Sequence, residues 1–161
     1  MHCLVIDDEE APRLLMSALI KRLGHRATTV HSGEAAIAIL GERHFDVAIV
    51  DMEMPGSDGA ETIVELRARQ ADLKILVVSG HDDRRYVLAA LEAGAEAYLI
   101  KDEVSELLAA TLRDIEAGFT LLSPRIHTST LRKLLRTLGR PVVEARAEPR
   151  SRPNLIPIKP D

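Results

Sequence analysis

The sequence predicts an α/β protein whose five-stranded parallel sheet is covered by helices on both faces. Short apolar segments alternate with amphipathic ones five times before residue 120. The short segments are apolar at consecutive positions, which is typical of parallel strands buried on both faces. Glycines close several of the amphipathic segments, as expected at helix ends. Right-handed helical crossovers between such strands produce an open, doubly wound sheet.

The first two strands and their helices are marked by the residues at their ends. Residues 3–6 are predicted as a short buried strand that ends at a pair of aspartates. Pro12 opens the following helix, in which leucines recur at helical spacing, and Gly24 closes it. Residues 26–30 form a second, weaker strand, and Ser32 is predicted to cap the next helix.

Three further strand–helix pairs repeat this pattern. Residues 47–50, 74–78 and 97–100 are apolar and are predicted as strands. A turn cluster containing proline and glycine precedes the third helix. The fourth and fifth helices are predicted over 86–92 and around the leucine-rich stretch 107–115.

The end of the chain differs from this regular part. Leucines at helical spacing within 121–139 predict an additional amphipathic helix with a basic opposite face. Residues 140–161 hold five of the eight prolines and predict an extended, flexible tail rich in proline and arginine. We therefore expect a main domain at 1–120, an extra helix and a tail.

Composition and charge limit the function. With 46% hydrophobic and 29% charged residues, the 161-residue chain is not a disordered protein. The single cysteine, Cys3, excludes an internal disulfide, and together with the absence of a signal peptide or membrane span it predicts a cytoplasmic protein. Residues 1–124 carry 12 basic and 22 acidic side chains, whereas 125–161 carry nine and three. The basic segment permits nucleic-acid contact, although folding back onto the acidic body is the favoured interpretation.

Polar side chains follow four of the predicted strands. Asp7 and Asp8 come after the first, Asp51 after the third, Ser79 after the fourth and Lys101 after the fifth. The carboxyl ends of parallel strands meet at one edge of the sheet, where ligands bind in such folds. Clustered carboxylates repel one another, and their oxygen atoms are ligands that favour Mg²⁺. With the metal bound, one carboxylate oxygen is left to attack phosphorus. A lysine and a hydroxyl suit the binding of phosphoryl oxygens.

Five separated motifs resemble those of response-regulator receiver domains, the CheY-like proteins. They are LVIDDE at 4–9, VAIVDMEMPGSDG at 47–59, VVSG at 77–80, AYLIKD at 97–102 and GFTLLSP at 118–124. The resemblance covers about residues 2–120 and is greatest to NarL/FixJ-type receivers, although the helix-turn-helix domain that follows in that family is missing here. It implies a flavodoxin-like sheet with the strand order 2-1-3-4-5.

The resemblance also implies roles for individual residues at the acidic end of the sheet. Asp51 matches the phosphoacceptor. Asp7, Asp8 and Asp51, with the backbone carbonyl of Glu53, match the ligands of Mg²⁺. Lys101 matches the lysine that binds the phosphoryl group.

Further matches concern the switch between two states. Ser79 matches the hydroxyl that moves toward the phosphoryl group, and Tyr98 the aromatic residue whose rotamer follows it. Gly80 leaves room for the phosphodonor. Glu53 and His81 flank the approach of the hydrolytic water and are expected to set the lifetime of the phosphorylated state. Alternatively, both of these side chains simply point to solvent.

The resemblance implies a two-component response regulator rather than an enzyme with turnover. A sensor histidine kinase or phosphotransfer protein supplies the phosphoryl group, and an unknown output protein or a second copy of the chain reads the surface near 80–85, with Tyr98 at its edge. A DNA-binding transcriptional regulator, or the remnant of one, acting through dimerisation or its basic segment is the alternative. A phosphate-ester hydrolase with Glu53 as its second acid is a third hypothesis, weakened by the missing cap domain.

Overall fold

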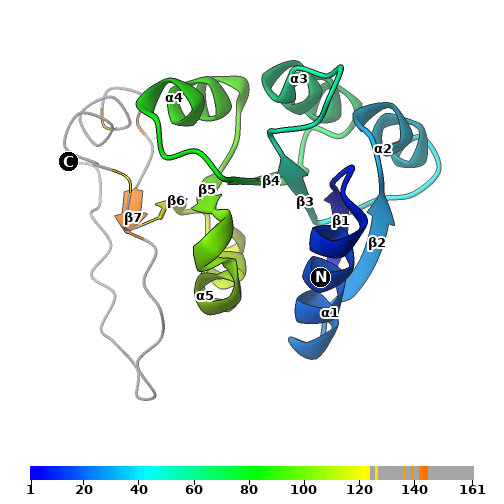
Figure 1. Cartoon of the computed structure of the whole chain (residues 1–161), viewed down its shortest axis with the longest axis horizontal. Helices are drawn as coiled ribbons and strands as arrows, with labels where there is room; N and C mark the ends of the chain where they lie inside the picture. Colours follow the sequence, from blue (N-terminus) through cyan, green and yellow to red (C-terminus); the bar gives the residue numbers. More distant parts are fainter. Residues whose placement is uncertain (124–125, 127–135, 137–138, 140–141, 145–161) are drawn as a thin grey trace.

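The structure is a computed structural model that describes residues 1–123, 126, 136, 139 and 142–144. Its strands form one parallel sheet in the order β2-β1-β3-β4-β5-β6-β7 (Figure 1). The strands are β1 (His2–Ile6), β2 (Arg26–Val30), β3 (Val47–Asp51), β4 (Lys74–Ser79), β5 (Ala97–Ile100), β6 (Thr120–Leu122) and β7 (Val142–Glu144). The helices are α1 (Glu10–Arg22), α2 (Gly33–Leu40), α3 (Gly59–Arg69), α4 (Arg84–Ala93) and α5 (Val104–Glu116), with a short 3₁₀ turn η1 (Lys101–Glu103). The predicted order 2-1-3-4-5 of the first five strands is confirmed.

Local signals explain where the helices begin and end. Pro12 lies in the first turn of α1, where a missing N–H costs no helical hydrogen bond. The Ser32 hydroxyl accepts a hydrogen bond from the Ala35 N–H at 3.1 Å, which confirms the predicted cap of α2. Gly94 ends α4 with φ at +112°, a backbone conformation that glycine adopts without the steric cost of a Cβ.

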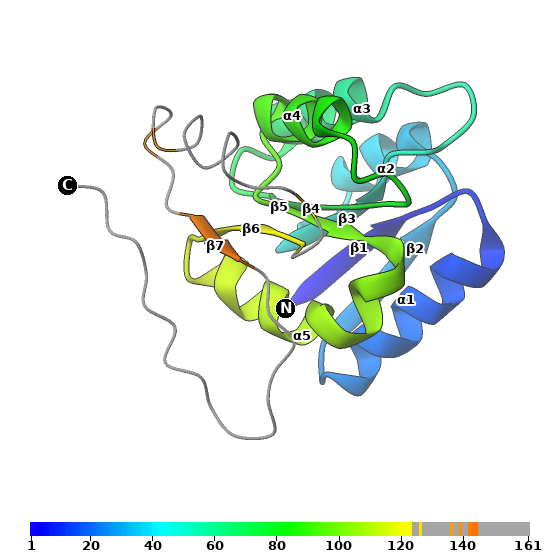
Figure 2. The same cartoon turned by 60° about the vertical axis from the view of Figure 1, so that its left-hand side comes forward.

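The helices cover the sheet in two layers. Helices α2, α3 and α4 lie on one face, and α1 and α5 lie on the other (Figures 1 and 2). Alternate side chains of each central strand enter the two cores. In β1, Leu4 and Ile6 join the α2–α4 core, while Cys3 and Val5 join the α1–α5 core. This confirms the prediction of strands buried on both faces.

The sheet continues beyond the five predicted strands, into a few residues of the segments predicted as the extra helix (121–139) and the tail (140–161). The first residues of the predicted helix belong to β6, and β7 lies within the predicted tail. Periodicity cannot separate a strand from a helix in so short an apolar run. This segment forms a strand because the backbone groups at the edge of β5 need hydrogen-bond partners. Ser123 donates its N–H to the Tyr98 carbonyl at 2.9 Å, and the Ser123 hydroxyl accepts from the Ile100 N–H at 2.8 Å.

Most of the predicted extra helix and of the Pro/Arg-rich tail lies outside the described residues, and so does most of the basic segment 125–161. The helix and the tail therefore stay predictions, and nucleic-acid contact, which the sequence permits but does not favour, stays untested. None of the helices in the described part of the chain combines the length and apolar character that a membrane span requires.

Candidate functional site

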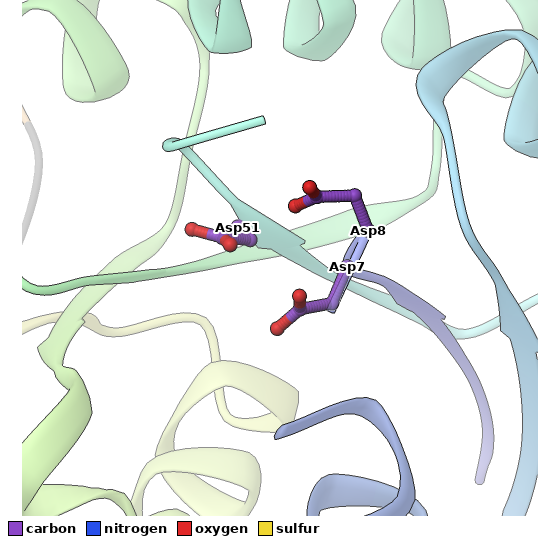
Figure 3. A group of neighbouring side chains, drawn as sticks. All are labelled: Asp7, Asp8 and Asp51. Atoms are coloured by element: carbon purple, nitrogen blue, oxygen red, sulfur yellow. The ribbon is translucent and has the colours of Figure 1, made fainter. Parts of the chain in front are cut away.

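Three aspartates converge at the carboxyl edge of the sheet. Asp7 and Asp8 directly follow β1, and Asp51 is the last residue of β3, the neighbouring strand. Figure 3 shows their side chains directed into the same space, and each offers a carboxylate oxygen within 4.8 Å of the others. Asp51 is only 2% exposed, Asp7 is buried and Asp8 is exposed. The parallel register thus brings together acids that are more than 40 residues apart in the sequence.

Hydrogen bonds hold two of these carboxylates in fixed orientations. Asp51 Oδ1 accepts from the Glu53 N–H at 3.0 Å, and Asp51 Oδ2 accepts from Lys101 Nζ at 3.1 Å. Asp7 Oδ1 accepts from the Glu9 N–H at 2.9 Å. The backbone N–H two residues after each acid therefore orients its carboxylate, and Lys101 supplies a positive charge beside Asp51.

The electrostatics of the cluster fit a cation. Burial raises the pKa of Asp7, and the charge of Asp51 adds to this rise against the opposing Glu9 hydrogen bond. Burial alone would lower the pKa of Lys101, but the hydrogen bond and charge of Asp51, together with Asp7 and Glu53, raise it overall. Carboxylate oxygens that lie this close together are hard ligands, which suit Mg²⁺.

The predicted switch residues lie together on the other side of Asp51. The buried Ser79 hydroxyl accepts from the His81 N–H at 3.1 Å. The Tyr98 hydroxyl donates to the His81 carbonyl at 2.8 Å, and burial of the ring raises the pKa of Tyr98 to about 12. Because Tyr98 is fully buried, the expectation that it lies at the edge of the surface is wrong. Its hydroxyl reaches that surface through the backbone carbonyl of His81.

Glu53 and His81 contact each other, so the alternative in which both simply point to solvent is wrong. His81 Nε2 lies 2.8 Å from Glu53 Oε1. The Glu53 carboxylate also lies within 3.7 Å of Lys101 Nζ and accepts a 3.5 Å hydrogen bond from Ser79. A Cβ at Gly80 would stand 3.3 Å from Glu53 Oε1, so a side chain at this position would crowd the Glu53 carboxylate.

Two residues at the site were missed by the sequence reasoning. Arg13 donates from Nη1 to the backbone carbonyl of Asp7 at 2.8 Å and so fixes the loop after β1. Tyr86 stacks on His81 with ring centroids 4.6 Å apart and is 41% exposed. An aromatic residue near the predicted switch loop was a visible signal for Tyr86, whereas no motif marked Arg13.

The fold and this edge define a class: a parallel α/β module with an acidic cluster, a lysine and a hydroxyl at the carboxyl ends of its central strands. The model of the response regulator receiver domain matches residues 3–113, and the chain belongs to this family. It is therefore a receiver domain of two-component signalling.

Curated relatives agree over the same region. The chain is 34% identical over 119 residues to the sensory/regulatory protein RpfC of Xanthomonas campestris, covering 71% of this chain and 16% of RpfC. It is 33% identical over 112 residues to the transcriptional regulatory protein AfsQ1 of Streptomyces coelicolor, covering 70% of this chain and 49% of AfsQ1. The chain thus spans between about a sixth and a half of these relatives.

Solved structures show the same architecture. A LuxR-family two-component response regulator from Aurantimonas aligns with a TM-score of 0.75 and 25% identity, covering 83% of this chain and 97% of that one. CheY4 of Vibrio cholerae aligns with a TM-score of 0.67 and 26% identity, covering 71% and 97%. The response regulator TrrA of Thermotoga maritima, solved in complex with Mg²⁺-BeF, aligns with a TM-score of 0.64 and 29% identity over 71% and 97%.

Proposed function

We propose that this receiver domain accepts a phosphoryl group on Asp51 and thereby switches a protein-interaction surface. The observation that carries the proposal is the buried Asp51 carboxylate, which lies in a cluster of three acids and 3.1 Å from Lys101 Nζ. Burying an ionised carboxylate costs folding free energy unless the charge is paired or binds a metal ion. Here the pairing leaves the carboxylate oriented at the open edge of the sheet.

The donor is a phosphohistidine on a sensor histidine kinase or phosphotransfer protein, or a small acyl phosphate. An Asp51 carboxylate oxygen attacks phosphorus and forms an O–P bond. With a phosphohistidine the P–N bond breaks and its electron pair returns to the imidazole. With an acyl phosphate the P–O bond to the acyl group breaks and a carboxylate leaves. Such transfers depend on positioning and charge more than on covalent chemistry by other side chains.

The chain's own residues provide that positioning. Asp7, Asp8 and Asp51, with the Glu53 backbone carbonyl, would hold Mg²⁺, which when bound supplies charge neutralisation for the phosphoryl oxygens. Lys101 balances charge next to Asp51, and the Ser79 hydroxyl offers a hydrogen bond. Gly80 leaves the donor an open path.

Phosphorylation adds roughly one negative charge and three acceptor oxygens at this edge. Ser79 reorients toward the new oxygens, and because its hydroxyl is bonded to the His81 N–H, the loop 80–85 and the start of α4 follow. The exposed His81–Tyr86 stack belongs to this surface. An output protein or a second copy of the chain reads it, and Glu53 with His81 sets how long the phosphoryl group survives.

The receiver unit in this proposal is residues 1–120 in the cytoplasm, and its product is its own phosphorylated form rather than a released compound. Intact-mass spectrometry after incubation with acetyl phosphate and Mg²⁺ tests it. The native chain should gain the mass of one phosphoryl group, and Asp51→Asn should not. Asp82→Asn, a change at an exposed acid of the neighbouring loop, is the matched control and should behave like the native chain. Equal phosphate uptake by Asp51→Asn would refute the proposal.

A further inference from the structure

The Glu53 carboxylate lies against the groups that the proposed function assigns to the phosphoryl oxygens. Its Oε1 accepts from the Ser79 hydroxyl at 3.5 Å and lies 2.8 Å from His81 Nε2. Its Oε2 lies 3.7 Å from Lys101 Nζ. One carboxylate thus contacts the hydroxyl and the ammonium group together, from the residue two positions after Asp51.

We infer that Glu53 is an internal anion that takes the place of the phosphoryl group in the unphosphorylated protein and that the incoming phosphoryl group displaces it. The inference rests on the proposed function and adds a role for this side chain. It differs from an effect on the hydrolytic water, because it acts before phosphorylation rather than after it.

The hydrogen-bond arrangement favours an anion at this position. The Ser79 oxygen already accepts from the His81 N–H at 3.1 Å, so its own hydrogen is left to donate outward, toward Glu53. Lys101 has three donor hydrogens, and Asp51 Oδ2 takes one of them. A carboxylate and a phosphoryl group share the acceptor oxygens and negative charge that such donors require.

The neighbouring residues leave room for this carboxylate. A Cβ on Gly80 would lie 3.3 and 3.4 Å from the two Glu53 oxygens, closer than most such contacts. The Glu53 side chain is 32% exposed, so solvent reaches it and it can swing away when a phosphodonor enters. Glycine therefore serves both the resting carboxylate and the entering donor.

Two of the proposed switch contacts meet at His81, in the loop after β4. Glu53 holds His81 from its side chain, and the Tyr98 hydroxyl holds His81 from its carbonyl. Ser79 and Tyr98 are both completely buried. The internal anion is thus linked to the loop after β4 through His81.

The kinetic test compares three variants. Glu53→Ala removes the carboxylate, and Glu53→Asp keeps the charge but shortens the side chain by one methylene, so that it no longer reaches Ser79 and Lys101. Glu10→Ala removes an exposed acid at the start of α1 and is the control for charge. We expect both Glu53 variants to be phosphorylated by acetyl phosphate about two- to fivefold faster than the native chain, the factor that partly exposed ion pairs provide.

Two results would overturn the inference. Glu53→Ala could match Glu10→Ala in rate, which would mean that no displacement takes place. Alternatively, Glu53→Asp could match the native chain, which would mean that charge alone acts, from a distance. Equal thermal unfolding of the variants excludes misfolding as a cause.

A spectroscopic test is independent of phosphorylation. In metal-free, unphosphorylated protein, the NMR signals of the His81 amide and the Tyr98 ring should move in Glu53→Ala and Glu53→Asp and stay in place in Glu10→Ala. Unmoved signals in the Glu53 variants would contradict the inference. If the native chain never gains phosphate, the proposed function fails. The NMR comparison still decides whether the Glu53 carboxylate influences His81 and Tyr98 in the unphosphorylated protein.

Discussion

Replacing Asp7 with asparagine should stabilise the metal-free protein at neutral pH and remove most of its response to Mg²⁺. Asparagine keeps the shape of the side chain and the oxygen that accepts from the Glu9 N–H. The change removes one of three charges whose oxygens lie within 4.8 Å of one another. Unit charges at that distance repel by about 0.9 kcal/mol in bulk water and more at lower effective dielectric.

Two such repulsions are lost, and the attraction of Asp7 to Lys101 offsets part of the gain. We therefore expect about 1 kcal/mol of added stability, which corresponds to a rise of about 2–4 °C in Tm for a chain of this size. The free energy of unfolding of the native protein, in contrast, should rise by about 2.7 kcal/mol when Mg²⁺ reaches a hundred times its Kd. That of the variant should rise little.

The stability difference between the Asp7→Asn variant and the native chain should also depend on pH. Because the folded-state pKa of Asp7 is raised, the stability linked to its protonation is fully present below the unfolded pKa and is lost as the pH rises through the folded pKa. The asparagine variant undergoes no such loss. Its advantage over the native chain should therefore be small near pH 3.5 and grow toward pH 7.

Urea unfolding in EDTA between pH 3.5 and 7, followed by thermal unfolding with and without Mg²⁺, measures both effects. Asp82→Asn again provides the matched control, since it removes an exposed acid outside the cluster. A variant that is less stable than the native protein at pH 7, or a gap that shrinks as the pH rises, would refute the electrostatic reasoning. An undiminished Mg²⁺ response would refute the assignment of Asp7 as a ligand.

Two further substitutions test the switch and the loop after β3. Tyr98→Phe removes the donor to the His81 carbonyl and should cost about 1 kcal/mol in urea unfolding, so an unchanged midpoint would contradict the 2.8 Å bond. Gly59→Ala places a Cβ 2.6 Å from Met52 Sδ and 3.1 Å from Met52 Cα, and should cost about 1–3 kcal/mol by overpacking; equal stability in the same assay would show that the loop yields freely.

The central part of the fold was predictable because its signals are local. Consecutive apolar residues identified the buried strands, and residues such as Ser32 and Gly24 identified helix ends. The gathering of Asp7, Asp51 and Lys101 was predictable as well, since parallel strands place their carboxyl ends at one edge. These conclusions depend on sequence order and on rules that hold for all such sheets.

Other features were decided only by the tertiary structure. The short run at β6 became a strand because the free edge of β5 offers backbone partners, which no periodicity reveals. Tyr98 turned inward, and Glu53 reached across to Ser79, His81 and Lys101, because side-chain direction depends on neighbours far away in the sequence. Local sequence patterns thus account for the first five strands and for the acids at their carboxyl ends. Long-range packing decided which donors those acids meet.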